Sequence, residues 1–134
     1  IQEVRAVSAI ATKGTLRNPS ILKGVPGEIV RDIPILKSNF DIIHEGMRLG
    51  VTEGTGKALN VSTVHVASKS GTAELGLEKS NVNSWITGFF PYENPHYAFA
   101  IVMEKGSVHN LIGAAAAMRQ VLDWMGKNTP EYFK

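Results

Sequence analysis

The segment from Tyr97 to Glu104 constrains the fold more than any other part of the sequence. Its apolar residues alternate between a bulky set and a smaller set, namely Tyr97, Phe99, Ile101 and Met103 against Ala98, Ala100 and Val102. Alternation with a period of two is typical of a β-strand. A strand that is apolar on both faces is usually covered on both sides. The sequence therefore predicts a strand with other elements packed above and below it.

Two further segments of strand character precede this one, from about Val64 to Glu74 and from about Trp85 to Phe90. The connections between the three segments are about 10 and 6 residues long, and the second contains Pro91 and Pro95. Antiparallel neighbours can be joined by short connections, whereas a parallel crossover needs a dozen or more residues. We therefore predict three consecutive antiparallel strands.

Helical spacing of apolar residues predicts three helices: one up to Gly14, one from about Asn39 to Thr52, and one that follows Asn110. We expect Gly14 to end the first helix in a left-handed conformation, and Asn110 to cap the third. Ser38 and Asp41 have the spacing of a capping box at the second. Helices packed on an antiparallel sheet make an α+β fold.

The third helix would bury one apolar face and carries a run of four alanines. The face consists of Leu111, Ala115, Met118, Leu122 and Met125. Because alanine lets a helix approach closely, we expect this helix to pack on the small face of the Tyr97 strand. Between the first two helices, a short extended piece interrupted by Pro19 is expected.

Composition and charge narrow the classes of function. The 134 residues fit one domain. Fourteen basic and twelve acidic residues give a net charge of +2, and the basic residues are scattered, so no nucleic-acid partner is expected. With no cysteine, and with no i, i+4 pair among the histidines, no metal site is expected. The histidines are His44, His65, His96 and His109.

The stretch Lys69-Ser70-Gly71-Thr72 combines a cation, two hydroxyls and a residue without a side chain within a predicted strand. Lysine attracts an anion, hydroxyls donate hydrogen bonds to a carboxylate, and glycine lets a ligand lie against the backbone. The alternative is a charged edge strand whose lysine only prevents aggregation. Four residues alone do not decide between these interpretations.

The surrounding sequence favours the first interpretation, because "KSGTAE" matches the lysine, serine or threonine, glycine motif of penicillin-binding proteins and serine β-lactamases. With "EGMRLGVTEGTGKAL" before it and "SWITGFFPYENPHYAFAIVMEKG" after it, the chain resembles the C-terminal half of the transpeptidase domain of class B, elongation-type penicillin-binding proteins. The resemblance implies a partial penicillin-binding-protein fold and a role in peptidoglycan cross-linking that uses no metal or organic cofactor. Lys69 would be catalytic, and Ser70, Gly71 and Thr72 would bind D-Ala-D-Ala stem peptides or β-lactams. The backbone N–H of Thr72 would form half of the oxyanion hole.

The other two motifs of the superfamily are missing from matching positions. The one S-x-x-K match, Ser20 to Lys23, lies in the extended piece rather than at the start of a helix, and S-x-N does not occur. The chain also opens at Ile1 without an initiator methionine or a capping residue. We therefore expect residues 1–134 to be the C-terminal portion of a transpeptidase domain, inactive without the upstream half that carries the nucleophilic serine.

Two other functions stay open: a penicillin-recognising relative such as a class D β-lactamase or sensor domain, and a non-catalytic interaction module that keeps the fold. For a transpeptidase, the resemblance implies a parent anchored by an N-terminal segment at the outer face of the bacterial inner membrane. Its partners would be stem peptides, β-lactams and the upstream half of the domain. Apolar surface meant for that half would be exposed here and could support self-association.

Overall fold

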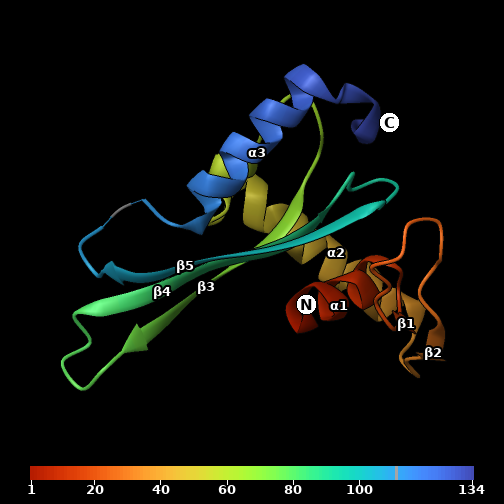
Figure 1. Ribbon diagram of the computed structural model, residues 1–134, viewed down its shortest axis with the longest axis horizontal. Coiled ribbons are helices and arrows are strands. Elements are labelled where there is room, and N and C mark those ends of the chain that lie inside the picture. The colour runs from red at the N-terminus through yellow and green to blue at the C-terminus, as the bar shows by residue number, and fades with distance from the viewer. Residues whose placement is uncertain (111) are drawn as a thin grey trace.

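The computed structural model of the chain describes residues 1–110 and 112–134. Its centre is an antiparallel sheet of order β3-β4-β5, formed by β3 (Ala67–Leu75), β4 (Asn81–Phe90) and β5 (Tyr97–Ser107). Helix α3 (Ala114–Asn128) lies on one face of this sheet and α1 (Gln2–Ala11) on the other (Figure 1). The arrangement confirms the predicted α+β fold with three consecutive antiparallel strands.

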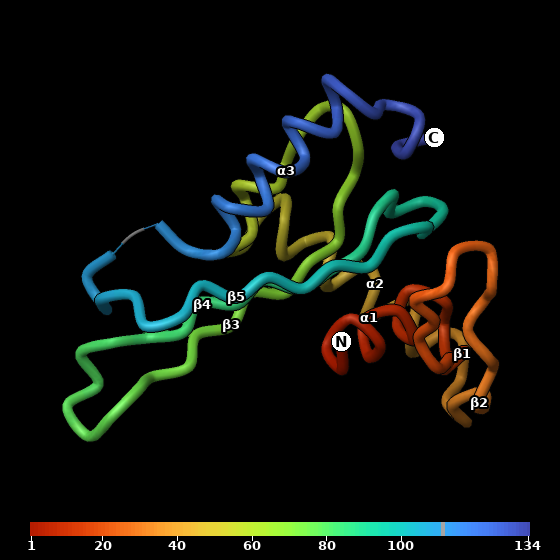
Figure 2. The backbone as a smooth tube through the Cα atoms, in the orientation of Figure 1, coloured from red at the N-terminus to blue at the C-terminus, as the bar shows by residue number. Residues whose placement is uncertain are grey.

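The remaining elements surround one end of the sheet. Helix α2 (Lys37–Thr52) packs against β3. A hairpin of β1 (Thr15–Arg17) and β2 (Ile29–Asp32) lies beside α1, on the side of the sheet away from α3 (Figure 2). Pro19 follows β1 in the loop of this hairpin, so it interrupts no strand. Short 3₁₀ turns occupy Lys57–Leu59 and Pro130–Phe133.

The strands differ from the predicted segments at their ends. β3 begins at Ala67 rather than Val64, because Val64 and Val66 are buried in the core from the loop before the strand. β4 begins at Asn81 rather than Trp85, since the polar residues before Trp85 continue the ladder with β3, down to the pair Asn81 and Leu75. The β3–β4 hairpin therefore extends beyond the helices, as Figure 2 shows.

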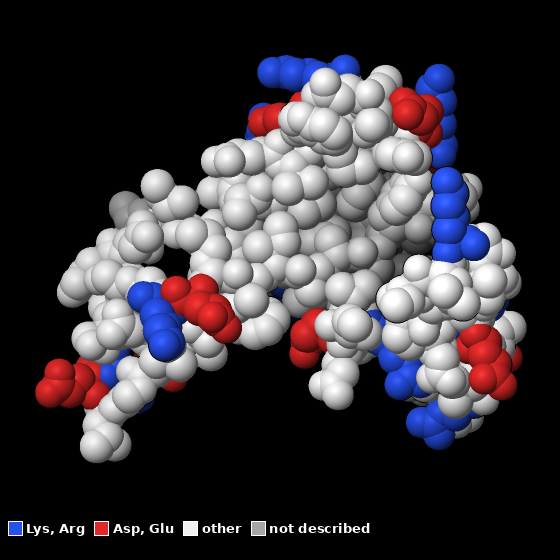
Figure 3. Space-filling model, viewed as in Figure 1, with Lys and Arg blue, Asp and Glu red and all other residues white. Residues whose placement is uncertain are grey.

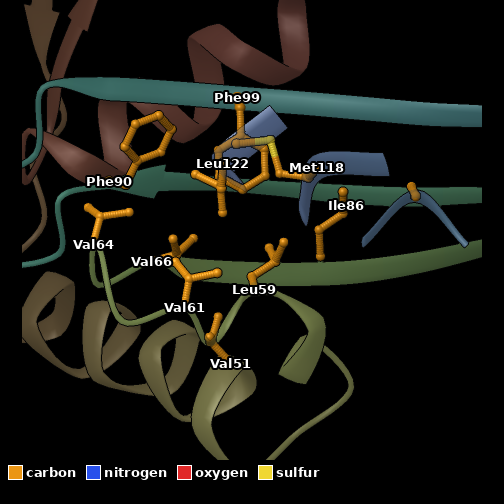
Figure 4. Packing of buried hydrophobic residues seen from close by; sticks show 11 residues of the cluster. Val51, Leu59, Val61, Val64, Val66, Ile86, Phe90, Phe99, Met118 and Leu122 are labelled. Carbon is orange, nitrogen blue, oxygen red and sulfur yellow. The ribbon is translucent and has the colours of Figure 1, made fainter. Parts of the chain in front are cut away.

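The larger core lies between α3 and the sheet and is drawn in Figure 4. It contains Val51, Leu59, Val61, Val64, Val66, Ile86, Phe90, Phe99, Ala114, Met118 and Leu122. Helix α3 therefore packs on the bulky face of β5, which contradicts the predicted contact with the small face. Ala98 from the small face instead packs with Val7 of α1 and with Phe89. The bulky side chains of β5 fill the space between the sheet and α3. On the other face, the small side chains of β5 leave room for α1 to pack close to the sheet.

The helix ends correct two predicted caps. Ser38 lies inside α2, and Asp41 binds Lys13 Nζ at 2.5 Å instead of closing a capping box. Asn110 accepts a hydrogen bond from the N–H of Ile112, while α3 starts only at Ala114, whose N–H donates to Ser84 Oγ at 3.0 Å.

The N–H of Gly14 donates to the carbonyl of Ala9 and the N–H of Lys13 to the carbonyl of Ile10, which confirms the predicted end of α1. The left-handed residue of this turn is Lys13, with φ of 55°, rather than Gly14, which follows it with φ of 112°. Leu111, predicted for the buried face of the third helix, lies outside the described residues. Among the residues that the structure describes, no helix has both the length and the apolar character needed to cross a bilayer.

Candidate functional site

The Lys69–Thr72 stretch lies in β3, an outer strand of the sheet. Lys69 pairs with Thr87 and Ser70 with Ile86 across the ladder. Successive side chains of a strand point to opposite faces. Ser70 and Thr72 therefore share the face covered by α3, and Lys69 lies on the face that α1 covers in part. The structure brings the two hydroxyls together and separates them from the lysine side chain.

Lys69 lies beside an open groove. Its side chain is exposed, and its Nζ donates a hydrogen bond of 2.6 Å to the carbonyl oxygen of Ser70. The groove has a volume of about 300 Å³ and is lined by Glu3, Lys69, Ser70, Gly71, Trp85 and Thr87. The motif is thus neither buried beneath a helix nor turned away from a groove, which is the placement that a binding strand requires.

Gly71 is not required by the packing of the sheet. A Cβ at this position would lie 3.4 Å from Trp85 Cβ, an ordinary contact distance, and the backbone of Gly71 has no positive φ. Its side chain would be exposed to solvent. The absence of a side chain at Gly71 therefore leaves space at the solvent-exposed surface of β3, although the packing of the sheet does not require it. Gly88 differs, because a Cβ there would lie 2.2 Å from the carbonyl oxygen of Ala67.

Ser70 has a partner that the sequence analysis missed. Its Oγ lies 2.5 Å from Oγ1 of Thr55, in the turn after α2, and Ser70 itself is half-buried. Thr72 is exposed and borders a second depression with Ser84 and Met103. The glycines on either side of Thr55 favour a turn, but only the tertiary structure places that turn against β3.

The side chains of three of the four histidines have partners, and these partners differ. His44 Nε2 contacts the carbonyl oxygen of Ile10, His65 binds the carboxylate of Glu93, and His96 contacts Asn94. The hydrogen bond from His65 holds the pKa of Glu93 below its usual range. No group of three or more His, Asp or Glu residues with metal-site geometry occurs within residues 1–110 and 112–134.

The single S-x-x-K match lies apart from the strand motif. Ser20 is in the exposed loop of the β1–β2 hairpin, where its Oγ accepts a hydrogen bond from the N–H of Leu22. It borders a groove between α1 and the hairpin that includes none of the motif residues of β3. The resemblance implies a nucleophilic serine at the start of a buried helix, whereas Ser20 is exposed and lies outside any helix.

The fold and the motif on its outer strand agree with the resemblance to penicillin-binding proteins that the sequence shows. Residues 1–123 match the family model described as the penicillin binding protein transpeptidase domain. The chain belongs to this family. The resemblance stated from the sequence is therefore confirmed.

Curated relatives and solved structures agree with the family match. The chain is 26% identical to the peptidoglycan D,D-transpeptidase MrdA of Haemophilus influenzae, over 92% of its own length and 23% of that protein. It is also 26% identical to penicillin-binding protein H of Bacillus subtilis, over 90% of the chain and 20% of that protein. The chain thus spans about a fifth to a quarter of the length of these relatives.

Two solved structures show the same fold. Penicillin-binding protein 2B of Streptococcus pneumoniae superposes with a TM-score of 0.76 at 20% identity, covering 96% of the chain and 25% of that protein. PBP2 of Pseudomonas aeruginosa, solved in complex with WCK 5153, gives a TM-score of 0.74 at 24% identity, covering 95% and 30%. The partial penicillin-binding-protein fold expected from the sequence is confirmed.

Proposed function

We propose that this chain is the C-terminal portion of the transpeptidase domain of a peptidoglycan D,D-transpeptidase and contributes its substrate-binding strand. The nucleophilic serine comes from another part of the same polypeptide. The observation that carries the proposal is the placement of Lys69, Ser70 and Gly71 on an outer strand beside an open groove, with Thr72 next to them at the edge of a second depression. Family membership supports it, and no metal or organic cofactor takes part in the proposed chemistry.

The parent enzyme forms and breaks an acyl-enzyme. The serine Oγ attacks the carbonyl carbon of the penultimate D-alanine, the peptide bond to the terminal D-alanine breaks, and that D-alanine leaves with the proton. An amine of a neighbouring stem peptide then takes the acyl group and releases the serine. β-Lactams acylate the same serine by opening their ring.

Each motif residue has a role in this cycle. Lys69 places a positive charge near the carboxylate and supports proton movement around the serine. Ser70 and Thr72, which share one face of β3, donate hydrogen bonds to the terminal carboxylate. The backbone N–H of Thr72 stabilises the developing oxyanion together with the N–H of the absent serine. Gly71 leaves the backbone open to the substrate.

The test is acylation by a fluorescent penicillin. The full-length parent should be labelled covalently, residues 1–134 alone should not, and Lys69→Ala in the parent should slow labelling by about a hundredfold or more. Lys79→Ala is the matched control, because Lys79 lies in the β3–β4 turn and pairs with Glu74 at 2.7 Å. Labelling of the isolated chain would overturn the assignment of the nucleophile.

Two outcomes would favour the other functions. Rapid hydrolysis of β-lactams by the parent would indicate a β-lactamase. Unchanged cell-wall synthesis with Lys69→Ala would indicate a non-catalytic module.

A peptidoglycan substrate places the parent at the extracytoplasmic face of the inner membrane, anchored by a segment outside this sequence.

Apolar side chains that are exposed in the chain support self-association or contact with the upstream half of the domain. Leu36 is 74% exposed and Ile42 is 68% exposed, both at or near α2. Charged side chains lie mainly around the edge of the face seen in Figure 3, over the helices and the hairpins, and leave its middle almost without charge. Light scattering of the isolated chain tests this proposal, and a monomer at all concentrations would contradict self-association.

A further inference from the structure

The turn that follows α2 is held in one conformation by close packing. The N–H of Gly54 donates to the carbonyl of Leu49 at 3.0 Å, and the N–H of Gly56 donates to the carbonyl of Gly50 at 2.9 Å. A Cβ at Gly54 would lie 2.9 Å from Gly50 O, and a Cβ at Gly56 would lie 2.8 Å from Ser68 Oγ. Neither position has room for a side chain, so the turn fixes where Thr55 stands.

Thr55 is the side chain that this turn presents to β3. Its Oγ1 lies 2.5 Å from the Oγ of Ser70, and either oxygen can be the donor. Ser68, Ser70 and Thr72 lie on the same face of β3 because they are two residues apart. Ser68 is only 1% exposed beneath Gly56, which keeps it from a ligand. Of the two hydroxyls that can reach a ligand, Ser70 is the one in contact with Thr55.

The hydrogen-bond inventory of a hydroxyl decides the direction of this contact when an anion is bound. A serine has one proton to donate and two lone pairs to accept with. If Ser70 gives its proton to a carboxylate, it can interact with Thr55 only as an acceptor. Thr55 must then donate to Ser70, and the two hydrogen bonds form a chain that ends on the ligand. Hydrogen bonds in such a chain strengthen one another.

We propose that Thr55 is a positioning residue of the carboxylate site. Its hydroxyl donates to Ser70 Oγ and so directs the proton of Ser70 toward a ligand that ends in a free carboxylate. This role rests on the proposed function, since it needs Ser70 to bind such a ligand. Thr55 is β-branched and therefore stiff about χ1, which limits the orientations that its hydroxyl can take. The pre-set orientation lowers the ordering cost of binding.

The experiment uses the full-length parent and separates binding from acylation. The rate of labelling by a fluorescent penicillin is measured against penicillin concentration, which gives a dissociation constant and a limiting acylation rate. Thr55→Val should raise the dissociation constant by about tenfold, because it removes one hydrogen bond from a chain that ends on a charged group. The limiting acylation rate should change by less than about twofold. Thr55→Ser keeps the hydroxyl and should stay within about threefold of the wild type.

Two controls separate positioning from a structural effect. Thr52→Val removes a hydroxyl from the end of the same helix, where it donates to the carbonyl of Arg48 at 3.4 Å, and should leave both constants unchanged. In a Ser70→Ala background, Thr55→Val should cost nothing further, because residues that act through one another are not additive. Thermal unfolding of every variant shows whether it is folded at the assay temperature.

The outcomes distinguish this proposal from the proposed function. A parent that no penicillin labels overturns both. A parent that is labelled normally but is insensitive to Thr55→Val overturns only the role of Thr55. An equal loss with and without Ser70 also overturns it, because Thr55 would then act independently. If Thr55→Val does not fold, the Thr55→Ser variant provides the test. A tenfold loss of penicillin affinity in folded Thr55→Ser, which keeps the hydroxyl, would contradict the proposal.

Discussion

Replacing Gly88 by alanine should destabilise the sheet that carries the motif. Gly88 of β4 pairs with Ser68, next to Lys69. A Cβ at Gly88 would lie 2.2 Å from the carbonyl oxygen of Ala67 and 2.9 Å from Cζ of Phe99. Non-bonded atoms are most favourable at about 3.5–4.0 Å, so both contacts would be strongly repulsive. The ring of Phe99 can turn, but the carbonyl belongs to β3, so the two strands must separate locally.

The cost follows from two opposing effects. Overpacking a close-packed interior costs about 1–3 kcal/mol, and the upper end applies because one contact is with main chain. Alanine recovers about 0.5–1 kcal/mol, because glycine loses more conformational freedom in a strand. The free energy of unfolding should therefore fall by about 2 kcal/mol. For a domain of this size, the melting temperature should fall by roughly 6–10 °C.

Urea and thermal unfolding of residues 1–134, followed by circular dichroism, measure this effect. Gly106→Ala is the matched control, because a Cβ at Gly106 in β5 would meet only the carbonyl oxygen of Val82 at 3.9 Å. This variant should be neutral or slightly more stable than the wild type. Equal stability of Gly88→Ala and Gly106→Ala would refute the close approach of β3, β4 and Phe99.

Two further predictions test contacts outside the motif. Ser84→Ala removes the hydroxyl that accepts from the N–H of Ala114 and should cost about 1 kcal/mol in urea unfolding, whereas Ala at the exposed Ser62 should cost little. His65→Ala should raise the pKa of Glu93 toward its ordinary value of 4.5 in an NMR titration. The pKa of Glu93 is lower in the folded state than in the unfolded state. The stability that this pair contributes is therefore present above pH 4.5 and is lost as the pH falls through the folded pKa. A pKa of Glu93 that does not change in His65→Ala would contradict the contact.

The strand motif could be predicted from the sequence because its signals are local. Lys69 and its neighbours are consecutive, and the period of two in a strand already places Ser70 and Thr72 on one face. The period of two in the Tyr97 segment and the apolar spacing before Gly14 likewise fixed a strand and a helix. Short connections required antiparallel pairing. These features depend on residues that are close together in the chain.

The partner of Ser70 could not be predicted, because Thr55 precedes it by 15 residues and no periodicity relates the two. The cap of α3 was missed for the same reason: Ser84 comes from β4, 30 residues before Ala114. Local capping patterns at Ser38 and Asn110 were present in the sequence. In the folded chain Asp41 instead binds Lys13, and the N–H of Ala114 at the start of α3 instead donates to Ser84.

By itself, the sequence determined the three helices, the antiparallel order of the three strands of the main sheet, and the faces on which the motif residues lie. Only the tertiary structure decided that α3 covers the bulky side of β5, that the turn at Thr55 presses on β3, and that the Lys69 side of the strand stays open. The physical reason is that periodicity reports which face of an element is apolar. Which neighbour covers that face depends on side-chain volumes brought together from distant parts of the chain.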